Sequence, residues 1–343
     1  MLLSIVIPCY NEEQRLPSRL QPYLGYLDKE PSDYEVILVD DGSTDTTLDV
    51  LRQLASLNHR IRVIHSETNR GRGFGMKTGV LASEGKYILE TDADLPVSPE
   101  HILKFIQFLD VTPFYDAVIG SREHPDSGFV LKQPFFRVFA GKVFHRIFML
   151  LFAIQFKDVM CGFKLFRSKA AKEIFNYVYD EKYLAAGEIV LVANRLGYRI
   201  KELPVVWEDD RRSKVRIWRD TWGALKGMLG MKIRAWQGLY PPGFKESARL
   251  VRRRYRGFNW PAIFTRIRFF TAPFKAILPY VPREGLIVDL GCGYGIFANL
   301  LALHSEKREI LGVELDEFKM KYAERGIKNV RFQAADITKI SIP

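Results

Sequence analysis

Two acidic residues, Asp92 and Asp94, stand one residue apart in the stretch TDADLP, directly after an apolar run at residues 87–89. In an extended chain, alternation would place both side chains on the same face of the backbone. Two carboxylates that close together raise each other's pKa unless a cation lies between them. A hard divalent cation with oxygen ligands, Mg²⁺ or Mn²⁺, fits this pattern. An Asp-rich turn after a strand is the alternative interpretation.

Two further polar motifs follow apolar runs near the N-terminus. The stretch PCYNEE follows residues 3–7, and VDDGSTD, which contains Asp40 and Asp41, ends the run at residues 35–39. A carboxylate at such a position can accept hydrogen bonds from a nucleobase N–H or from ribose hydroxyls. The alternative is an Asx turn, followed by a helix over residues 46–57 that Asp45 caps.

The stretch NRGRGFGMKTG, residues 69–79, combines glycines with the cations Arg70 and Arg72 and leads into a helical pattern. Glycine lets a backbone approach a ligand closely, and N–H groups at the start of a helix favour an anion. The motifs so far supply an acid that can bind a base, a cationic glycine loop and an acid pair suited to a metal. Together they indicate a site for a nucleoside diphosphate joined to another group.

The residues between these motifs predict the scaffold that would gather them. Strand-like runs at residues 3–7, 35–39, 62–65, 87–90 and 117–120 alternate with helical patterns. This alternation predicts an α/β fold with a mostly parallel, helix-covered sheet. Ligands of such sheets bind beyond the carboxyl ends of the strands. Because the motifs stand at those ends, we expect them to converge, and the metal interpretation of the acid pair is favoured over the turn.

Composition and the lengths of the apolar runs indicate in which compartment the protein works. The chain has 343 residues, enough for two domains, and its three cysteines show no CxxC pair, which argues against a disulfide framework or a zinc site. The N-terminal stretch MLLSIVIP lacks the basic region and the length of a signal peptide. No apolar run reaches the length of a membrane-spanning helix. We therefore expect a protein bound peripherally at the cytoplasmic face of a membrane.

Positive charge is concentrated in one region. Between Arg211 and Arg283 there are 18 Lys and Arg against two acids, a net charge of +16, so the rest carries −5 of the total of +11. Four of the five tryptophans lie in the same region. Cations interleaved with aromatic residues fit an anionic membrane surface, which we prefer, or nucleic acid, which we do not expect as a partner. A solvated charged face would explain the cations alone.

Three stretches combine apolar and basic residues at helical spacing. Residues 130–156 are apolar except for cations such as Arg137, Lys142 and Arg146, and residues 218–236 and 261–278 repeat the theme with aromatic residues. Amphipathic helices that lie in a membrane interface are one interpretation, and for residues 130–156 a buried core helix is the other.

The first 235 or so residues resemble family 2 inverting glycosyltransferases of the polyprenyl-phosphate type, in particular the dolichyl-phosphate β-glucosyltransferase group. Seven motifs in family order carry the resemblance: SIVIPCYNEE, VILVDDGSTD, NRGRGFG, TDADLP, IGSRE, DVMCGFKLFR and GYRIKELPVVWEDDRRSKV. The resemblance implies a GT-A fold and a nucleotide-sugar donor, with UDP-glucose preferred. It also implies Mg²⁺ or Mn²⁺ and a dolichyl or other polyprenyl phosphate acceptor.

The resemblance also implies roles for individual residues. Donor-binding residues would be Pro8, Tyr10, Asn11, Glu12, Asp40, Asp41, Gly71, Arg72, Asp92, Arg211 and Arg212. Metal ligands would be Asp92 and Asp94, and catalytic residues Asp94, Arg122, Arg137, Glu188 and Lys214. Of these, Arg122 and Arg137 match positions that bind the acceptor phosphate, whereas Arg211, Arg212 and Lys214 match a basic loop that closes over the donor. The chain departs from the family at Ala186, where an Asp is usual, and at Met160, where a Gln is common.

A different pattern begins near residue 286. A strand, a turn with Gly291, Gly293 and Gly295, and a helix are followed by strands ending in Glu314 and Asp336. This resembles the opening half of a class I methyltransferase that uses S-adenosylmethionine, with Asp289 in the same site. The resemblance names S-adenosylmethionine as a candidate cofactor. Because only about three strands are present where the family needs roughly seven, we expect no methyl transfer by this chain.

These patterns predict three parts: a glycosyltransferase domain at residues 1–238, basic and aromatic linker helices at 239–283, and a truncated methyltransferase-like domain at 284–343. They leave three hypotheses of function. The first is a sugar transferase that acts on a lipid phosphate, with mannosyl transfer from GDP-mannose as its variant. The second is a methyltransferase with an accessory nucleotide-sugar domain. The third is a membrane or nucleic-acid binder without catalytic activity.

Overall fold

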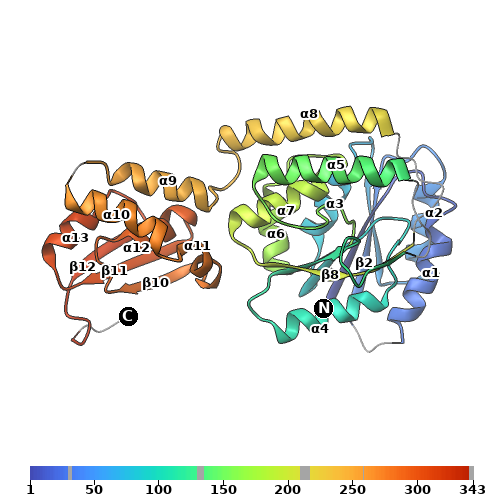
Figure 1. Cartoon of the computed structure of the whole chain (residues 1–343). Coiled ribbons are helices and arrows are strands. Elements are labelled where there is room, and N and C mark those ends of the chain that lie inside the picture. Colours follow the sequence, from blue (N-terminus) through green and yellow to red (C-terminus); the bar gives the residue numbers. More distant parts are fainter. Residues whose placement is uncertain (30–32, 130–134, 209–216, 258, 340–343) are drawn as a thin grey trace. The chain divides into compact units, whose positions relative to one another are not determined.

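The computed structural model describes the chain except for residues 30–32, 130–134, 209–216, 258 and 340–343, and except for the side chains of residues 135–140 and 217–222. The chain forms two compact units (Figure 1). One contains residues Met1–Asn194 and Tyr198–Leu239, and the other contains Arg195–Gly197 and Tyr240–Pro343. The helices of residues 239–283, which we expected to be a separate linker, belong to the second unit together with the strands that follow them.

The N-terminal unit is built on a seven-stranded sheet of order β3-β2-β1-β4-β7-β5-β8. Its strands are β1 (Leu3–Cys9), β2 (Tyr34–Asp41), β3 (Ile61–Ser66), β4 (Tyr87–Glu90), β5 (Ala117–Ser121), β7 (Lys164–Arg167) and β8 (Ile200–Pro204). All are parallel except β7, which lies antiparallel between β4 and β5. The mostly parallel α/β fold is thus confirmed, and each strand-like run predicted from the sequence falls on one of these strands.

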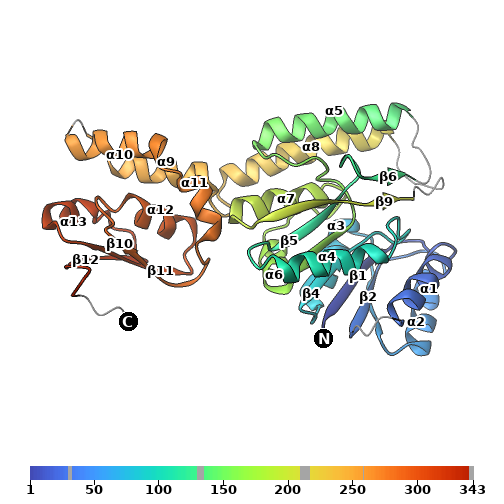
Figure 2. The same ribbon diagram turned by 60° about the horizontal axis from the view of Figure 1, so that its bottom comes forward.

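Helices cover both faces of this sheet (Figures 1 and 2). On one face α1 (Leu16–Leu27), α2 (Thr47–Leu57) and α4 (Glu100–Val111) bury an apolar core against the strands. On the other, α3 (Arg72–Ala82) and α6 (Ser168–Asn176) pack together. Gly79 lets α3 approach closely, since a Cβ there would lie 2.3 Å from Cγ1 of Val6. The expected cap of α2 at Asp45 is wrong, because the N-cap residue is Thr46, and Asp45 instead accepts from the Thr47 N–H at 3.0 Å in a turn that precedes the helix.

Two long helices lie outside α7 (Ala185–Leu196) on the same side of the N-terminal unit: α5 (Phe135–Phe152) and α8 (Ile217–Trp236) (Figures 1 and 2). Phe148 of α5 is fully buried, and its ring lies where a Cβ on Gly187 of α7 would be only 3.0 Å away. Met228 and Met231 of α8 are likewise buried. Within the described part of the chain, no helix is long and apolar enough to span a membrane.

A two-stranded ribbon of β6 (Gly128–Phe129) and β9 (Val206–Trp207) completes the N-terminal unit.

The C-terminal unit has a parallel sheet of order β10-β11-β12. Its elements are α9 (Phe244–Arg254), α10 (Trp260–Thr271), α11 (Phe274–Ile277), the 3₁₀ turn Leu278–Tyr280, β10 (Gly285–Leu290), α12 (Ile296–His304), β11 (Arg308–Glu314), α13 (Glu317–Ala323) and β12 (Val330–Ala334). Side chains of α9, α11 and α12 share one apolar cluster, so these linker helices and the glycine-turn region fold as one core.

Candidate active site

The loops after β1 and β2 are joined at the carboxyl edge of the large sheet. The backbone N–H of Asn11 donates to Oγ of Ser43 at 3.0 Å, and the N–H of Thr44 donates to Oδ1 of Asn11 at 2.9 Å. Asn11 has a positive φ of 54°, which turns the chain sharply after Tyr10. Tyr10 is exposed, 38% of its surface being accessible. The motifs PCYNEE and VDDGSTD therefore form one rigid rim, as the convergence of strand ends predicted.

The two acids of VDDGSTD have different surroundings. Asp41 accepts hydrogen bonds from the backbone N–H of Arg70 at 3.0 Å and of Gly71 at 2.6 Å, and so fixes the glycine loop that opens α3. Asp40 is fully buried and one of its oxygens lies 2.8 Å from Nδ1 of His65 on β3. Asp41 thus holds the glycine loop against the rim, and Asp40 connects the end of β2 to β3. His65, which the sequence did not single out, is the more accessible member of the Asp40 pair.

Asp92 is held by the glycine loop. Nε of Arg72 donates to Oδ1 of Asp92 at 2.5 Å. Burial alone would lower the pKa of Arg72, but the charges of Asp92 and Glu90 raise it above its ordinary value. Both terminal amino groups of this guanidinium are buried and have no hydrogen-bond partner among the described residues. An arginine with two unused donors beside an acid pair is suited to an anionic ligand, because unmade hydrogen bonds of a buried cation are costly.

The segment after Asp92 is a turn, so the extended geometry that we expected for Asp92 and Asp94 is wrong. The backbone N–H of Leu95 donates to the carbonyl oxygen of Asp92 at 3.0 Å, and Leu95 has a φ of 45°. Strand β4 ends at Glu90, two residues before this turn begins. The two carboxylates are nevertheless neighbours, since Asp92 is one of the charges that raise the pKa of Asp94.

Asp94 is a half-buried acid. Burial first, and then the charge of Asp92, raise its pKa to about 6, while Arg15 opposes the rise. Arg15 itself donates to Oε2 of Glu12 at 2.7 Å. Arg15 therefore links Glu12 of the rim electrostatically to the acid pair Asp92 and Asp94. The sequence analysis did not identify Arg15 as a site residue.

The acid pair fits a divalent cation that is completed by a ligand. Among the described residues, no group of three or more His, Cys, Asp or Glu side chains could hold a metal on its own. Two carboxylates are nonetheless a common protein contribution to Mg²⁺ sites, where phosphates and water supply the remaining ligands. The raised pKa of Asp94 marks a carboxylate that a cation would stabilise.

Arg122 follows β5 and is locked in place. Its Nε and NH2 groups donate to the two oxygens of Asp158 at 2.7 and 2.9 Å, and its guanidinium lies 4.8 Å from the ring centre of Trp207. Asp158 is nearly fully buried, and although burial alone would raise its pKa, the charge of Arg122 holds that pKa below its ordinary value. The paired bonds to Asp158 and the contact with Trp207 thus fix the guanidinium of Arg122 in one orientation.

Glu188 has contacts that describe a positioning role. The side chain is fully buried in the first turn of α7. Its Oε2 accepts from the backbone N–H groups of Tyr179 and Asp180 at 2.8 and 2.6 Å, and its Oε1 accepts from Arg234 of α8 at 3.0 Å. Glu181, the residue after Asp180, pairs with Arg70 of the glycine loop. Glu188 thus connects helix α8 to the loop that holds Asp92.

Four residues expected in the site lack a described side chain. Arg137 lies on α5, but its side chain is outside the described residues, and Arg211, Arg212 and Lys214 lie wholly outside them. Pro8 is on β1, where its Cβ would lie 3.0 Å from a Cβ added to Gly75 of α3. The described site therefore consists of the rim, the Arg72–Asp92–Asp94 group and Arg122.

The acids expected around the glycine turn of the C-terminal unit are hydrogen-bonded to backbone or side-chain groups of the chain. Gly291, Gly293 and Gly295 all have positive φ, between 57° and 70°. Glu314 accepts from the backbone N–H of Gly293 at 2.9 Å and from that of Leu315 at 3.1 Å. Asp336 accepts from the N–H and hydroxyl of Thr338 at 2.9 and 2.7 Å. The oxygens that we expected to contact a cofactor are thus engaged by the chain itself.

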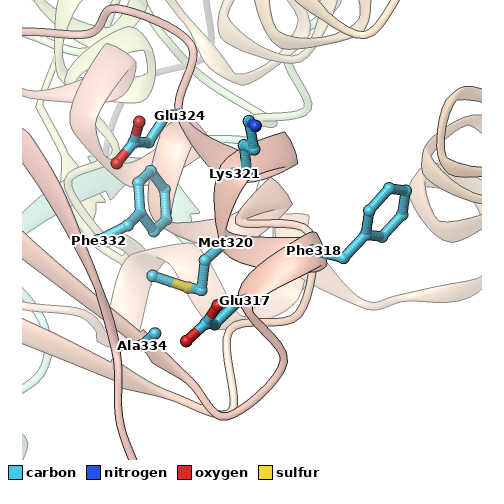
Figure 3. A pocket seen from close by; sticks show the side chains of 7 residues that line it. All are labelled: Glu317, Phe318, Met320, Lys321, Glu324, Phe332 and Ala334. Carbon is cyan, nitrogen blue, oxygen red and sulfur yellow. The ribbon is translucent and has the colours of Figure 1, made fainter.

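Asp289, at the end of β10, differs from these two acids. One of its oxygens is buried without a hydrogen-bond partner among the described residues, and burial raises its pKa to about 6. A hollow of about 480 Å³ in the same unit lies elsewhere, between α13 and β12. Figure 3 shows Met320 and Phe332 side by side in this hollow, with Phe318 pointing away. The glycine turn does not line it.

The fold and the site define a class of protein: an α/β protein whose sheet edge gathers carboxylates and arginines suited to an anionic ligand. The chain belongs to glycosyl transferase family 2, whose sequence pattern matches residues 4–175. It is a glycosyltransferase, which excludes the hypothesis of a binder without catalytic activity.

Several relatives are similar over more than two thirds of the chain. The dolichyl-phosphate beta-glucosyltransferase of Dictyostelium discoideum is 32% identical over 252 residues, which are 69% of this chain and 76% of that protein. The proteins of the same name from Homo sapiens and Saccharomyces cerevisiae are 33% and 32% identical, over 69% and 70% of this chain and 77% of each relative.

A solved structure shows the same fold. Mannosyl-3-phosphoglycerate synthase from Rubrobacter xylanophilus superposes with a TM-score of 0.51 at 16% identity, over 69% of this chain and 75% of that one. At this identity the similarity concerns the GT-A architecture alone.

Proposed function

We propose that this protein transfers glucose from UDP-glucose to a dolichyl or other polyprenyl phosphate at a membrane surface, with inversion at the anomeric carbon. The observation that carries the proposal is Arg72, which bonds to Asp92 while its two terminal amino groups are buried and have no hydrogen-bond partner among the described residues. The names of the relatives from Dictyostelium discoideum, Homo sapiens and Saccharomyces cerevisiae support the choice of sugar and acceptor.

The donor would bind along the rim. Tyr10, Asn11 and Glu12 after β1, with Asp40 and Asp41 after β2, would surround the nucleoside, as the resemblance implies. Gly71 has a φ of 117°, a conformation that favours glycine, and its N–H is bonded to Asp41. This fixed loop presents Arg72 to the diphosphate. Arg211 and Arg212 would join it from the basic loop that follows β9.

Asp92 and Asp94 would hold the divalent cation, Mg²⁺ or Mn²⁺. A bound cation supplies positive charge that stabilises the departing nucleoside diphosphate. Arg72 adds a second positive charge on the same group, and its buried environment strengthens the interaction. Lys214 would contribute a third from the basic loop.

The acceptor needs no dedicated general base. A phosphate monoester already carries most of its negative charge near neutral pH, so an oxygen of the lipid phosphate can attack the anomeric carbon directly. Arg122 would hold that phosphate, because Asp158 and Trp207 fix its guanidinium in one orientation, and Arg137 of α5 would assist. Attack on the side opposite the leaving group inverts the anomeric configuration. Glu188 would act by positioning the turn at residues 179–181.

Helices α5 and α8 would seat the N-terminal unit on the membrane that contains the acceptor. Exposed apolar residues follow helical spacing on both: Val143, Ile147, Leu150 and Leu151 on α5, and Leu225, Leu229, Ile233 and Trp236 on α8. Leu150 and Trp236 are 78% and 88% exposed. Basic residues such as Lys142, Lys226 and Lys232 lie between them. A basic helix with an exposed apolar stripe is suited to a bilayer interface.

A donor screen tests the proposal. The full chain, with MnCl₂ or MgCl₂ and a detergent-dispersed polyprenyl phosphate, should transfer radiolabel from UDP-glucose to the organic phase, and Asp94→Asn should abolish the transfer. Unphosphorylated polyprenol should accept nothing. Greater transfer from GDP-mannose would instead support the mannosyl variant. Absence of transfer from any nucleotide sugar to the lipid phosphate would refute the assigned acceptor.

No observation favours the methyltransferase alternative, because Glu314 already accepts from Gly293 of the glycine turn and Asp336 already accepts from Thr338. Incubation with S-adenosylmethionine labelled in its methyl group serves as a parallel arm of the screen. We expect no label to be transferred.

A further inference from the structure

Helix α10 of the C-terminal unit has an exposed apolar stripe. Its members are Trp260, Ile263, Phe264, Ile267 and Phe270. They follow the spacing i, i+3, i+4, i+7 and i+10, which places them on one side of a helix. The opposite side is buried, since Ala262 and Thr265 are fully inaccessible. The helix therefore packs on its unit through small residues and leaves its large ones outside.

The stripe is not a loosely packed part of the core. Phe270 is 83% exposed, Trp260 66% and Ile267 51%. Phe264 alone has a described ring contact, with Tyr294 at 5.5 Å between ring centres. Leaving side chains of this size in water is unfavourable, and a contiguous apolar patch on a soluble surface indicates a binding surface.

Arginines border the stripe on both sides. At about 3.6 residues per turn, Arg266 falls on one flank of the apolar arc and Arg268 on the other. Both are exposed, and α10 contains no acidic residue. The neighbouring helix α9 ends in Arg252, Arg253 and Arg254, all exposed. Long basic side chains beside an apolar arc can reach phosphate groups while their stems cover apolar surface.

We propose that this face of α10 binds the surface of an anionic lipid bilayer. The apolar stripe would enter the boundary between headgroups and acyl chains, and the flanking arginines would bind lipid phosphates. Two aliphatic residues, Ile263 and Ile267, lie within the stripe, which suits acyl chains better than the flat stacking on bases that single-stranded nucleic acid requires. The proposal concerns the C-terminal unit and is independent of the sugar and acceptor assigned above.

Vesicle flotation of the full chain tests the proposal. Vesicles of phosphatidylcholine with phosphatidylglycerol should bind the protein more tightly than phosphatidylcholine alone, and the difference should shrink as salt is raised. The triple variant Trp260→Gln, Ile267→Gln, Phe270→Gln should bind anionic vesicles at least about tenfold more weakly, because each side chain removed has a large burial free energy. Arg266→Gln with Arg268→Gln should lose about fivefold per arginine on anionic vesicles only.

A matched control uses apolar residues of similar exposure in the N-terminal unit. Leu57 and Val111 are 78% and 77% exposed, and Leu57→Gln with Val111→Gln should leave vesicle binding unchanged. The triple variant should also retain wild-type transfer to a detergent-dispersed acceptor. A failure of the membrane proposal is therefore distinguishable from a failure of the proposed reaction.

Hydrogen exchange on the unmodified protein locates the contact without any substitution. Anionic vesicles should slow the exchange of amides in residues 260–271, and single-stranded RNA should not. Equal vesicle binding by the triple variant and the wild type would overturn the proposal. So would unchanged exchange in this helix, or protection by RNA in place of vesicles. If the triple variant does not fold, the exchange experiment decides.

Discussion

Gly162 and Asp92 are in such close contact that a Cβ atom on Gly162 would lie 2.0 Å from Oδ2 of Asp92. The same Cβ would lie 3.2 Å from NH2 of Arg72. The segment that leads into β7 therefore forms one wall of the site, and only glycine leaves room for the acid and its arginine.

Gly162→Ala should displace Asp92 and lower the transfer rate by about 10²-fold, the order expected when a catalytic group is displaced by about 1 Å. The measurement is the initial rate of transfer at saturating donor and acceptor. Gly25→Ala is the control, because a Cβ there meets nothing within 4 Å. Replacing this glycine in helix α1 should stabilise the protein by up to about 1 kcal/mol and leave the rate unchanged.

Metal affinity should depend on pH through Asp94. Without metal, burial and the charge of Asp92 raise the Asp94 pKa to about 6, and a cation must displace that proton to bind. Below pH 6 the apparent dissociation constant for Mn²⁺ should therefore rise about tenfold per pH unit, and above pH 7 it should be constant. Titration calorimetry with UDP-glucose present measures this dependence. Asp94→Asn should bind Mn²⁺ weakly at every pH, and an unchanged pH dependence in that variant would assign the proton to another group.

Arg122 should determine affinity for the acceptor and not for the donor. Arg122→Lys keeps the charge but loses the two parallel bonds to Asp158, so we expect the KM for the lipid phosphate to rise about tenfold with little change in the KM for UDP-glucose. Arg52→Lys is the control, since Arg52 lies on the surface with 64% of its side chain exposed. Asp158→Asn should instead destabilise the protein by about 3 kcal/mol, because it leaves a largely buried guanidinium unpaired.

Glu188 and Arg234 should be energetically coupled. Single variants Glu188→Gln and Arg234→Gln and their combination form a double-mutant cycle, for which we expect a coupling of about 1–3 kcal/mol in unfolding free energy. The surface pair Arg60 and Asp28 is the comparison, and its coupling should be clearly smaller. Because Glu188 holds the turn beside the glycine loop, Glu188→Gln should also raise the KM for the donor. A cycle with additive effects would contradict the positioning role.

The C-terminal unit should lose stability in acid through His304. Burial, and then the charges of Arg308 and Arg283, lower its pKa to about 3, whereas in the unfolded chain the pKa is about 6.5. The unfolded state thus binds the proton first, and the contribution of His304 to stability, which is present above pH 6.5, falls by about 1.4 kcal/mol per pH unit as the pH drops toward 3. Hydrogen exchange of α12 amides in wild type and His304→Gln measures it, because the difference between the two proteins isolates His304 from Asp289, whose raised pKa acts in the opposite direction. The difference in stability between wild type and His304→Gln should show this slope, and the difference between wild type and His59→Gln, at an exposed position, should not.

Much of the scaffold was predictable because local pattern and position agree in it. The runs that became β1 to β5 are apolar and bounded by turn residues, and the motifs at their ends lie on the edge where parallel strands must place them. Strand β7 was not predicted. Its four residues, KLFR, are too short to show alternation, and Lys164 is buried only because it pairs with Glu90 at 2.7 Å.

The sequence identified many residues of the site but not the contacts between them. Asp92 and Arg72 were both identified, but their bond depends on how α3 approaches β4, which no local pattern encodes. Asp158 was inside a quoted motif, and only the structure pairs it with Arg122. Glu188 was placed among the catalytic residues, and only the structure shows that it accepts hydrogen bonds from the backbone of residues 179 and 180 and from an arginine 46 residues away. Long-range partners of this kind are set by packing.

Strand β7 lies between β4 and β5 in the sheet, although both precede it in the chain. During synthesis the ribosome therefore releases β4 and β5 long before the strand that must join them. Until then each exposes a row of unpaired N–H and C=O groups, the kind of edge on which chains associate wrongly. The pairing of β4 with β7 is also a long-range one, which slows folding. Nascent chains that stop short of residue 164 should depend on chaperones, and they should aggregate when released alone.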